Sequence, residues 1–188
     1  MNNKIYVGID PGKDGAMSFL YPNGSVEVRL FPKIGTEYNV LEMTNIFKDM
    51  SIDPDYKYHV IIEDVKALQR PMDAGNWELS RGKTILEVSC LAFKVPMTMV
   101  HSKTWQKEMW QGIPEQREPS KTSINKKGEK VTKQGSVLTK EMSKLAATRL
   151  FPSIDFRNPD RKTERAKSLH TGVVDSLLIA EFGRRKKY

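Results

Sequence analysis

Cysteine and histidine are scarce in this sequence, which has one cysteine and three histidines among 188 residues. A single cysteine cannot form an internal disulfide, and three scattered histidines do not make a zinc-binding cluster. Cys90 lies in an apolar stretch and is expected to be a small core residue. No apolar run approaches the roughly 20 residues of a membrane span, and the first residues lack a basic, apolar leader. We therefore expect a soluble, unsecreted protein.

Acidic residues are too few to balance the basic ones. The 23 Asp and Glu residues face 31 Lys and Arg residues, which gives a formal net charge of +8. A basic protein favours polyanionic partners, because each phosphate that it neutralises releases counterions. Nucleic acid is the leading candidate and an anionic membrane surface the weaker one. The hydrophobic (38%) and charged (29%) fractions are those of a globular protein, and the length predicts one domain over residues 1–188.

The hydrophobic pattern predicts an α/β layered domain that begins with an antiparallel meander of three strands. The expected strands are Lys4–Ile9, Ala16–Tyr21, Ser25–Phe31, Tyr58–Ile62 and Pro96–Val100. The expected helices are Glu37–Met50, Ala74–Lys94, a short helix around Trp105, Leu138–Phe151 and about Gly172–Arg185. The aromatic residues Trp105, Trp110 and Phe151 are expected in the core rather than as base-stacking platforms.

The segment of residues 112–137 differs from the rest of the chain. It is rich in Lys, Ser, Thr, Gln and Gly, contains two prolines and has no apolar periodicity. We predict a mobile, basic loop of functional length here, not a domain boundary.

Three acidic residues stand in otherwise apolar surroundings. Asp10 and Glu63 each end an apolar strand, and Asp175 lies early in an apolar helix. Each has a structural alternative: a turn cap for Asp10, a salt bridge for Glu63 and a helix-dipole contact for Asp175. Carboxylates grouped in this way repel one another unless hard cations lie between them, which favours Mg²⁺ or Mn²⁺.

Five segments follow one another along nearly the whole chain: Tyr6–Gly12 (YVGIDPG), Val60–Val65 (VIIEDV), Thr104–Lys107 (TWQK), Ala146–Pro152 (AATRLFP) and His170–Ala180 (HTGVVDSLLIA). Each motif is modest alone. Their ordered set resembles the successive motifs of RuvC-type Holliday junction resolvases, especially phage-encoded ones.

The resemblance implies an RNase H-like fold, in which a mixed sheet has three antiparallel strands followed by two parallel ones. It also implies a homodimer with two active sites, each holding two Mg²⁺ or Mn²⁺ ions. Asp10 would bridge both ions, Asp175 would share one and Glu63 the other. The implied activity is hydrolysis that leaves 5′ phosphates, with paired nicks across a four-way DNA junction and possibly at flaps and forks. Such an enzyme would act in the cytoplasm of a bacterial cell or of a phage-infected host.

Two positions depart from the family pattern. The family usually has a fourth acidic or histidine ligand one helical turn before the last Asp, where this chain has Thr171 and Gly172. His170 is the nearest substitute, and it is a candidate catalytic residue, although a plain helix-capping role is the structural alternative. Lys66 stands where some resolvases carry an aromatic residue that enters the branch point.

The candidate DNA-contacting residues share a positive charge: Lys66, Arg70, Lys83, Lys103, Lys107, Lys121, Lys126, Lys127, Lys130 and Lys133. The apolar face of the helix predicted over Ala74–Lys94 is explained equally by a dimer interface and by packing on the sheet. Two other function classes remain open. One is a non-catalytic module that binds branched DNA, and the other is an ATPase domain like those of actin and the sugar kinases, for which the chain is short.

Overall fold

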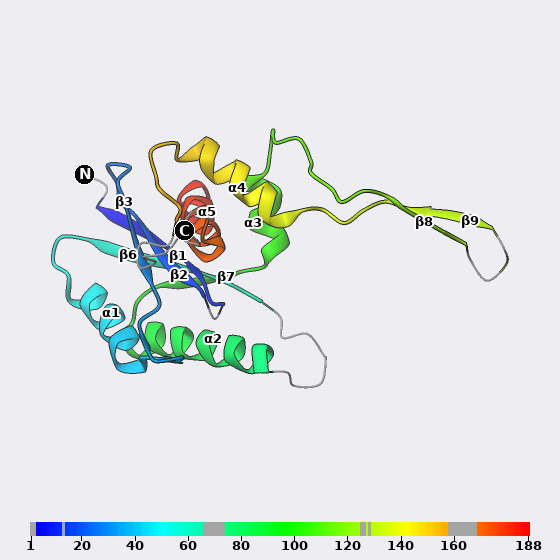
Figure 1. Ribbon diagram of the computed structural model, residues 1–188. Coiled ribbons are helices and arrows are strands. Elements are labelled where there is room, and N and C mark those ends of the chain that lie inside the picture. Colours follow the sequence, from blue (N-terminus) through cyan, green and yellow to red (C-terminus); the bar gives the residue numbers. More distant parts are fainter. Residues whose placement is uncertain (1–2, 13, 66–73, 125–126, 128, 158–168) are drawn as a thin grey trace.

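The computed structural model describes residues 3–12, 14–65, 74–124, 127, 129–157 and 169–188. The strands of its main sheet are β1 (Lys4–Asp10), β2 (Ala16–Leu20), β3 (Val26–Leu30), β6 (Lys57–Glu63) and β7 (Met97–Val100). They lie in the order β3-β2-β1-β6-β7 (Figure 1). The first three are antiparallel, and β6 and β7 run parallel to β1. The predicted mixed sheet is therefore confirmed.

Helices cover both faces of this sheet. They are α1 (Val40–Ile52), α2 (Ala74–Ala92), α3 (Ser102–Met109), α4 (Thr139–Leu150) and α5 (Thr171–Lys186). The pair α1 and α2 lies on one face, and α3, α4 and α5 lie on the other (Figure 1). Within the described ranges, no helix is long and apolar enough to cross a membrane.

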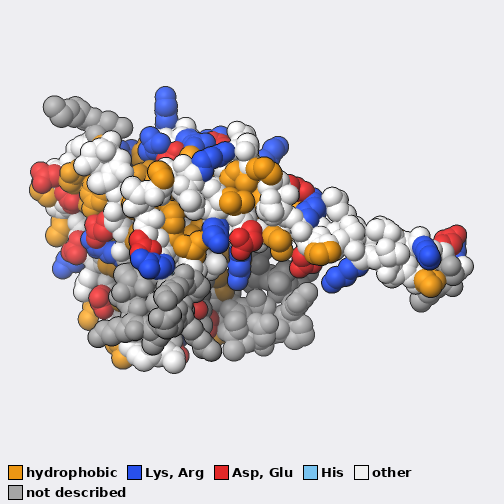
Figure 2. Space-filling model, turned by 45° about the horizontal axis from the view of Figure 1, so that its top comes forward, with side chains coloured by type: hydrophobic (Ala, Val, Ile, Leu, Met, Phe, Trp, Pro, Cys, Tyr) orange, Lys and Arg blue, Asp and Glu red, His pale blue; other side chains and the backbone are white. Residues whose placement is uncertain are grey.

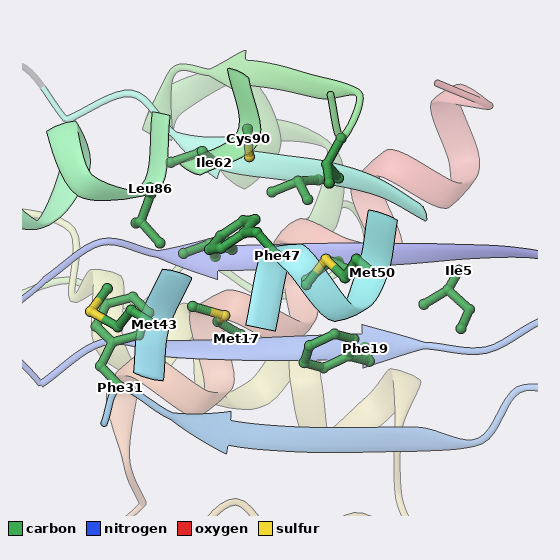
Figure 3. Packing of buried hydrophobic residues seen from close by; sticks show 14 of the residues in the cluster. Ile5, Met17, Phe19, Phe31, Met43, Phe47, Met50, Ile62, Leu86 and Cys90 are labelled. Atoms are coloured by element: carbon green, nitrogen blue, oxygen red, sulfur yellow. The ribbon is translucent and has the colours of Figure 1, made fainter. Parts of the chain in front are cut away.

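Alternate residues of β1 belong to two separate cores. Ile5 and Ile9 are fully buried against the α1 side, where Phe47 packs over the sheet (Figure 3). Tyr6 belongs to the other core, which is built with α3, α4 and α5. Because side chains alternate along a strand, Asp10 shares the face of Tyr6. The carboxylate at the end of β1 is thereby presented toward α5.

The close contact between α5 and β1 depends on Gly8. A Cβ atom at this position would lie 2.0 Å from the Ser176 carbonyl oxygen and 2.3 Å from the Ala180 nitrogen. Real Cβ atoms do not approach backbone atoms so closely, so only glycine lets the two backbones meet here. The helix therefore lies directly on the strand, with Asp175 on the same side of the sheet as Asp10.

The first helix starts later than the sequence predicted. It was expected from Glu37 but begins at Val40, because Glu37–Tyr38 (β5) pairs with Lys33–Ile34 (β4) in a small hairpin. The Asn39 side chain then accepts a hydrogen bond from a backbone N–H in the first turn. An amide-bearing cap residue of this kind marks where a helix starts, whereas apolar periodicity locates only its buried face.

The loop predicted over residues 112–137 is wrong in part, because an antiparallel hairpin forms inside it. Its strands are β8 (Lys121–Ile124) and β9 (Lys130–Lys133), and they project from the body as an arm (Figures 1 and 2). All of the described hairpin side chains except Val131 are exposed. A ribbon that buries almost nothing needs no alternation of apolar and polar residues, so the sequence carried no strand signal.

Candidate metal centre

Two of the predicted carboxylates meet at one end of the sheet. The register of the parallel strands places Ile9 opposite Ile62, so Asp10 and Glu63 follow side by side. Burial raises the pKa of Asp10 to about 6, the Gly12 N–H lowers it, and the nearby Glu63 raises it further. That N–H donates to Asp10 Oδ1 over 3.0 Å and fixes the orientation of the carboxylate.

Glu63 is held from the other side by a tryptophan. Its side chain is 8% exposed, and its Oε1 accepts a hydrogen bond of 3.1 Å from the indole Nε1 of Trp105. The next residue, Asp64, faces the opposite layer, where its Oδ1 lies 2.5 Å from Lys83 Nζ on α2. The alternation predicted from the strand therefore separates the two neighbouring acids, and Glu63 alone is directed to the α5 side.

The third carboxylate, Asp175, has an atom with no partner. Its Oδ1 is buried and makes no hydrogen bond. Burial raises the pKa of Asp175 to about 7, and the negative charges of Asp10 and Glu63 raise it further, while Ser143 and Lys140 lower it. All three predicted carboxylates therefore lie within electrostatic reach of one another.

The donor set fits a hard divalent cation. An orphaned carboxylate oxygen is costly in a protein interior, and acids that raise one another's pKa are stabilised by a cation between them. In the part of the chain that the structure describes, no three His, Cys, Asp or Glu side chains form a group that could hold a metal ion as they stand. The fit therefore rests on the unsatisfied oxygen and the mutual repulsion of the carboxylates.

Solved structures share this arrangement of strands and helices. Thermus thermophilus RuvC in complex with a Holliday junction substrate matches with a TM-score of 0.56 and 12% sequence identity, over 97% of this chain and 94% of that one. The chain has the RuvC fold. A second structure of Thermus thermophilus RuvC matches with a TM-score of 0.49 and 14% identity, over 97% and 96% of the two chains. No family model and no curated protein matches the sequence.

His170 acts as a helix cap on this RuvC fold. Its Nδ1 accepts a hydrogen bond of 3.2 Å from the Val173 N–H at the start of α5. Gly172, one of the two positions at which the family pattern expects the fourth ligand, has no room for a side chain, since a Cβ would lie 2.4 Å from the Asp14 carbonyl oxygen. The capping interpretation is thus supported by a contact, and a metal-ligand role for His170 stays a prediction.

Sequence reasoning missed the polar face of α4 beside Asp175, which also carries Glu141, the ion-pair partner of Lys144. Lys140, Ser143 and Lys144 of α4 line a pocket of about 400 Å³ together with Asp175. These three positions are spaced i, i+3 and i+4, so they share one face of their helix. That spacing is visible in the sequence, but nothing local indicates that this face is the one beside Asp175.

The predicted DNA-contacting residues fall into three groups. Lys83 forms an ion pair with Asp64 and lies 3.6 Å from Glu87, so its charge is neutralised by acids of the protein and does not favour a DNA contact. The exposed residues are Lys103 and Lys107 on α3 and Lys121, Lys127, Lys130 and Lys133 on the arm. Lys66, Arg70 and Lys126 lie outside the described residues.

The predicted core positions of Cys90 and Trp105 are confirmed, as both are buried, and Trp110 and Phe151 pack partly buried against the core.

Proposed function

We propose that this protein is a divalent-metal-dependent, structure-selective endonuclease that hydrolyses branched DNA, with four-way junctions as its main substrate. The convergence of Asp10, Glu63 and Asp175 at one end of the sheet, with a buried Asp175 oxygen lacking a partner, carries the proposal. The enzyme acts in recombination, repair or phage DNA processing, in the cytoplasm of a bacterial cell or an infected host. Two Mg²⁺ or Mn²⁺ ions are its cofactors.

The carboxylates have distinct roles in this proposal. Asp10, Glu63 and Asp175 would hold the ions, with Asp10 as the ligand that the family resemblance assigns to both. Bound ions of this kind activate water and stabilise the leaving oxygen of an in-line phosphoryl displacement. Lys140 brings positive charge to the Asp175 pocket and offsets part of the repulsion between the carboxylates and a DNA phosphate, whereas Lys144 is paired with Glu141.

The choice of branched DNA is supported by two observations. The net charge of +8 favours a polyanion, and the Thermus thermophilus RuvC of the same fold is in complex with a Holliday junction substrate. We extend the substrate class to flaps and forks, which are also branched DNA.

A panel of labelled synthetic substrates tests the function. Four-way junctions, flaps, forks and linear duplex are incubated with Mg²⁺, Mn²⁺ or EDTA. We expect metal-dependent, paired nicks with 5′ phosphate ends on the four-way junction, slower cleavage of flaps and forks, and none of duplex. Tight junction binding without cleavage under any metal would identify a non-catalytic DNA-binding protein instead, and ATP hydrolysis without cleavage would identify the ATPase class.

Metal binding is expected to stabilise the fold in a pH-dependent way. The pKa values of Asp10 and Asp175, about 6 and about 7, lie above the usual 3.8. The folded, metal-free protein thus keeps protons that the unfolded chain releases, and its stability falls as the pH rises from about 4 to about 7. A cation binds the ionised carboxylates, so the stabilisation that it gives grows over the same range.

Thermal unfolding with EDTA and with saturating Mg²⁺, at about pH 5 and about pH 8, measures this effect. A cation present at about 100 times its Kd adds about 2.7 kcal/mol, which is roughly 5–10 °C for a chain of this size. We expect a shift of that order at the higher pH and little at the lower one. Asp175→Asn should remove most of it, and equal shifts at both pH values would contradict the prediction.

The arm is proposed to contact the DNA backbone. Lys121 and Lys133 lie directly opposite one another in the hairpin, and Lys130 lies opposite Ile124 (Figure 2 shows cationic side chains on the arm). Like charges in cross-strand register repel one another, so an anionic partner between them stabilises the ribbon.

Replacing Lys121, Lys130 and Lys133 together with Gln is expected to weaken junction binding equally for all DNA sequences. Each phosphate contact that is lost lowers the slope of log K against log salt by about 0.9. The control is Lys48, Lys57 and Lys94 replaced with Gln, which removes the same charge from exposed positions elsewhere. If both triple variants show the wild-type slope, the arm does not touch phosphates.

A homodimer is proposed through the outer face of α2. Leu86 and Cys90 of this helix pack on the sheet, whereas Trp77, Val88 and Leu91 are 57%, 58% and 68% exposed. The two alternatives for this helix are therefore compatible, because it has two apolar faces. Trp77 and Leu91 are separated by two heptads, and Val88 precedes Leu91 by three residues, so the three side chains lie on one face of the helix.

Leu91→Asp is expected to shift the dimer toward monomer by at least ~10-fold in Kd, since it places a charge in the buried part of such an interface. Analytical ultracentrifugation over a range of concentrations measures the shift. Ile52→Asp, at a position 67% exposed at the end of α1, is the matched control. A monomeric wild-type protein would overturn the homodimer.

A further inference from the structure

The indole of Trp105 is the hydrogen-bond donor observed on the Glu63 carboxylate. The bond between Nε1 and Oε1 is 3.1 Å long and buried, and Trp105 is fully buried. We propose that Trp105 is a positioning residue that fixes Glu63 for cation binding by holding one carboxylate oxygen and leaving the other to the metal. This rests on the proposed metal centre.

An indole suits this task for chemical reasons. Its N–H donates a hydrogen bond but the ring nitrogen accepts none, so Trp105 orients Glu63 without competing for the cation. The indole is also uncharged. A Lys or Arg in the same place would neutralise Glu63 and reduce its affinity for metal, as Lys83 neutralises Asp64 on the other face.

The fold fixes the position of Trp105 through the strand β7 that precedes its helix and through the core in which its side chain is buried. Val100, at the end of β7, lies opposite Glu63 in the sheet, and α3 begins two residues later. The His101 side chain accepts a hydrogen bond from the Lys103 N–H and caps this helix. One turn into α3, Trp105 lies in the core that α3 shares with α5. A rigid donor thus reaches Glu63 from the neighbouring strand connection.

The chain provides a matched control in Trp110. This residue ends the same helix, and its indole nitrogen is buried but has no hydrogen-bond partner. Replacing either tryptophan with Phe removes an indole N–H and similar volume from neighbouring parts of one core. Only Trp105→Phe also removes a contact to Glu63.

Calorimetric titration of the DNA-free protein with Mn²⁺ or Mg²⁺ alone provides the first test. Loss of an outer hydrogen bond to a metal ligand typically costs about 10–100-fold in metal affinity. We expect a weakening of that size for Trp105→Phe and less than about 2-fold for Trp110→Phe, with junction nicking by Trp105→Phe largely restored at high metal concentration. Equal affinities in the two variants would overturn the proposal.

Indole ¹H–¹⁵N spectra of the wild-type protein provide a second test that does not require Trp105→Phe to fold. The chain has three tryptophans, whose signals are assigned with Trp110→Phe and Trp77→Phe. The Trp105 signal should move on addition of Mg²⁺ and in Glu63→Gln, and the Trp110 signal should move little. If metal binds but the Trp105 signal does not move, the positioning role of Trp105 is overturned and the metal centre stands. If the wild-type protein binds no metal, the metal centre itself fails and this proposal with it, whatever the outcome of the DNA cleavage panel.

Discussion

Asp10→Asn is expected to abolish DNA cleavage while leaving junction binding unchanged or tighter. The substitution keeps the size of the side chain and removes a carboxylate that lies within electrostatic reach of Glu63 and Asp175. The proposed centre would then lose one of its three carboxylate ligands, and a loss of roughly 10³-fold or more in rate is the scale on which removal of such a charge acts. Binding is preserved because a negative charge facing the DNA phosphates has gone.

Single-turnover nicking and electrophoretic binding of one labelled junction measure the two effects separately. The matched control is Asp14→Asn, a nearby acid whose side chain is 76% exposed and paired with Lys33. This variant should stay within about 3-fold of the wild-type rate, as expected for an exposed ion pair. Nicking by purified Asp10→Asn at a near-wild-type rate would contradict the assignment of the active site.

The predicted strands and the placement of two acids came from local patterns, whereas the order of parallel and antiparallel strands came from the family resemblance. The apolar run before Asp10 and the turn residues after it were enough to place Asp10 at a strand end. The continuous apolar run before Glu63 placed that residue at the next strand end. Both signals lie within a few residues of the side chain concerned, which is why the sequence reveals them.

Contacts between distant segments were not predictable in the same way. Trp105 was assigned to the core correctly, but its hydrogen bond to Glu63 joins residues 42 positions apart. Lys140 reaches the Asp175 pocket only because α4 packs beside α5. The arm left no signal, since strands that bury nothing need no apolar pattern. The contacts of Trp105 and Lys140 depend on which faces of distant helices and strands pack together, and the local sequence pattern does not specify this packing.

A large effect on stability is expected at Gly8, which the sequence showed only as one residue of the Tyr6–Gly12 segment. Gly8→Ala adds a methyl group 2.0 Å from one backbone atom of α5 and 2.3 Å from another. Backbone cannot rotate away as a side chain can, so α5 must lift from β1. That movement opens the core around Leu177 and separates Asp175 from Asp10.

We expect Gly8→Ala to lower the free energy of unfolding by about 4 kcal/mol or more, which corresponds to at least about 8 °C in Tm for a chain of this size. Nicking should be lost even at temperatures where the variant remains folded, because its carboxylates no longer converge.

Gly183→Ala is the matched control. It adds the same methyl group at another contact of α5 with the sheet, but the atom that it meets, at 2.4 Å, is the end of the Ile61 side chain. A side chain can repack at a cost of about 1–3 kcal/mol. Thermal unfolding of both variants by circular dichroism, with nicking measured below each Tm, decides the matter: equal losses of stability would show that the backbone contact at Gly8 does not set the position of α5.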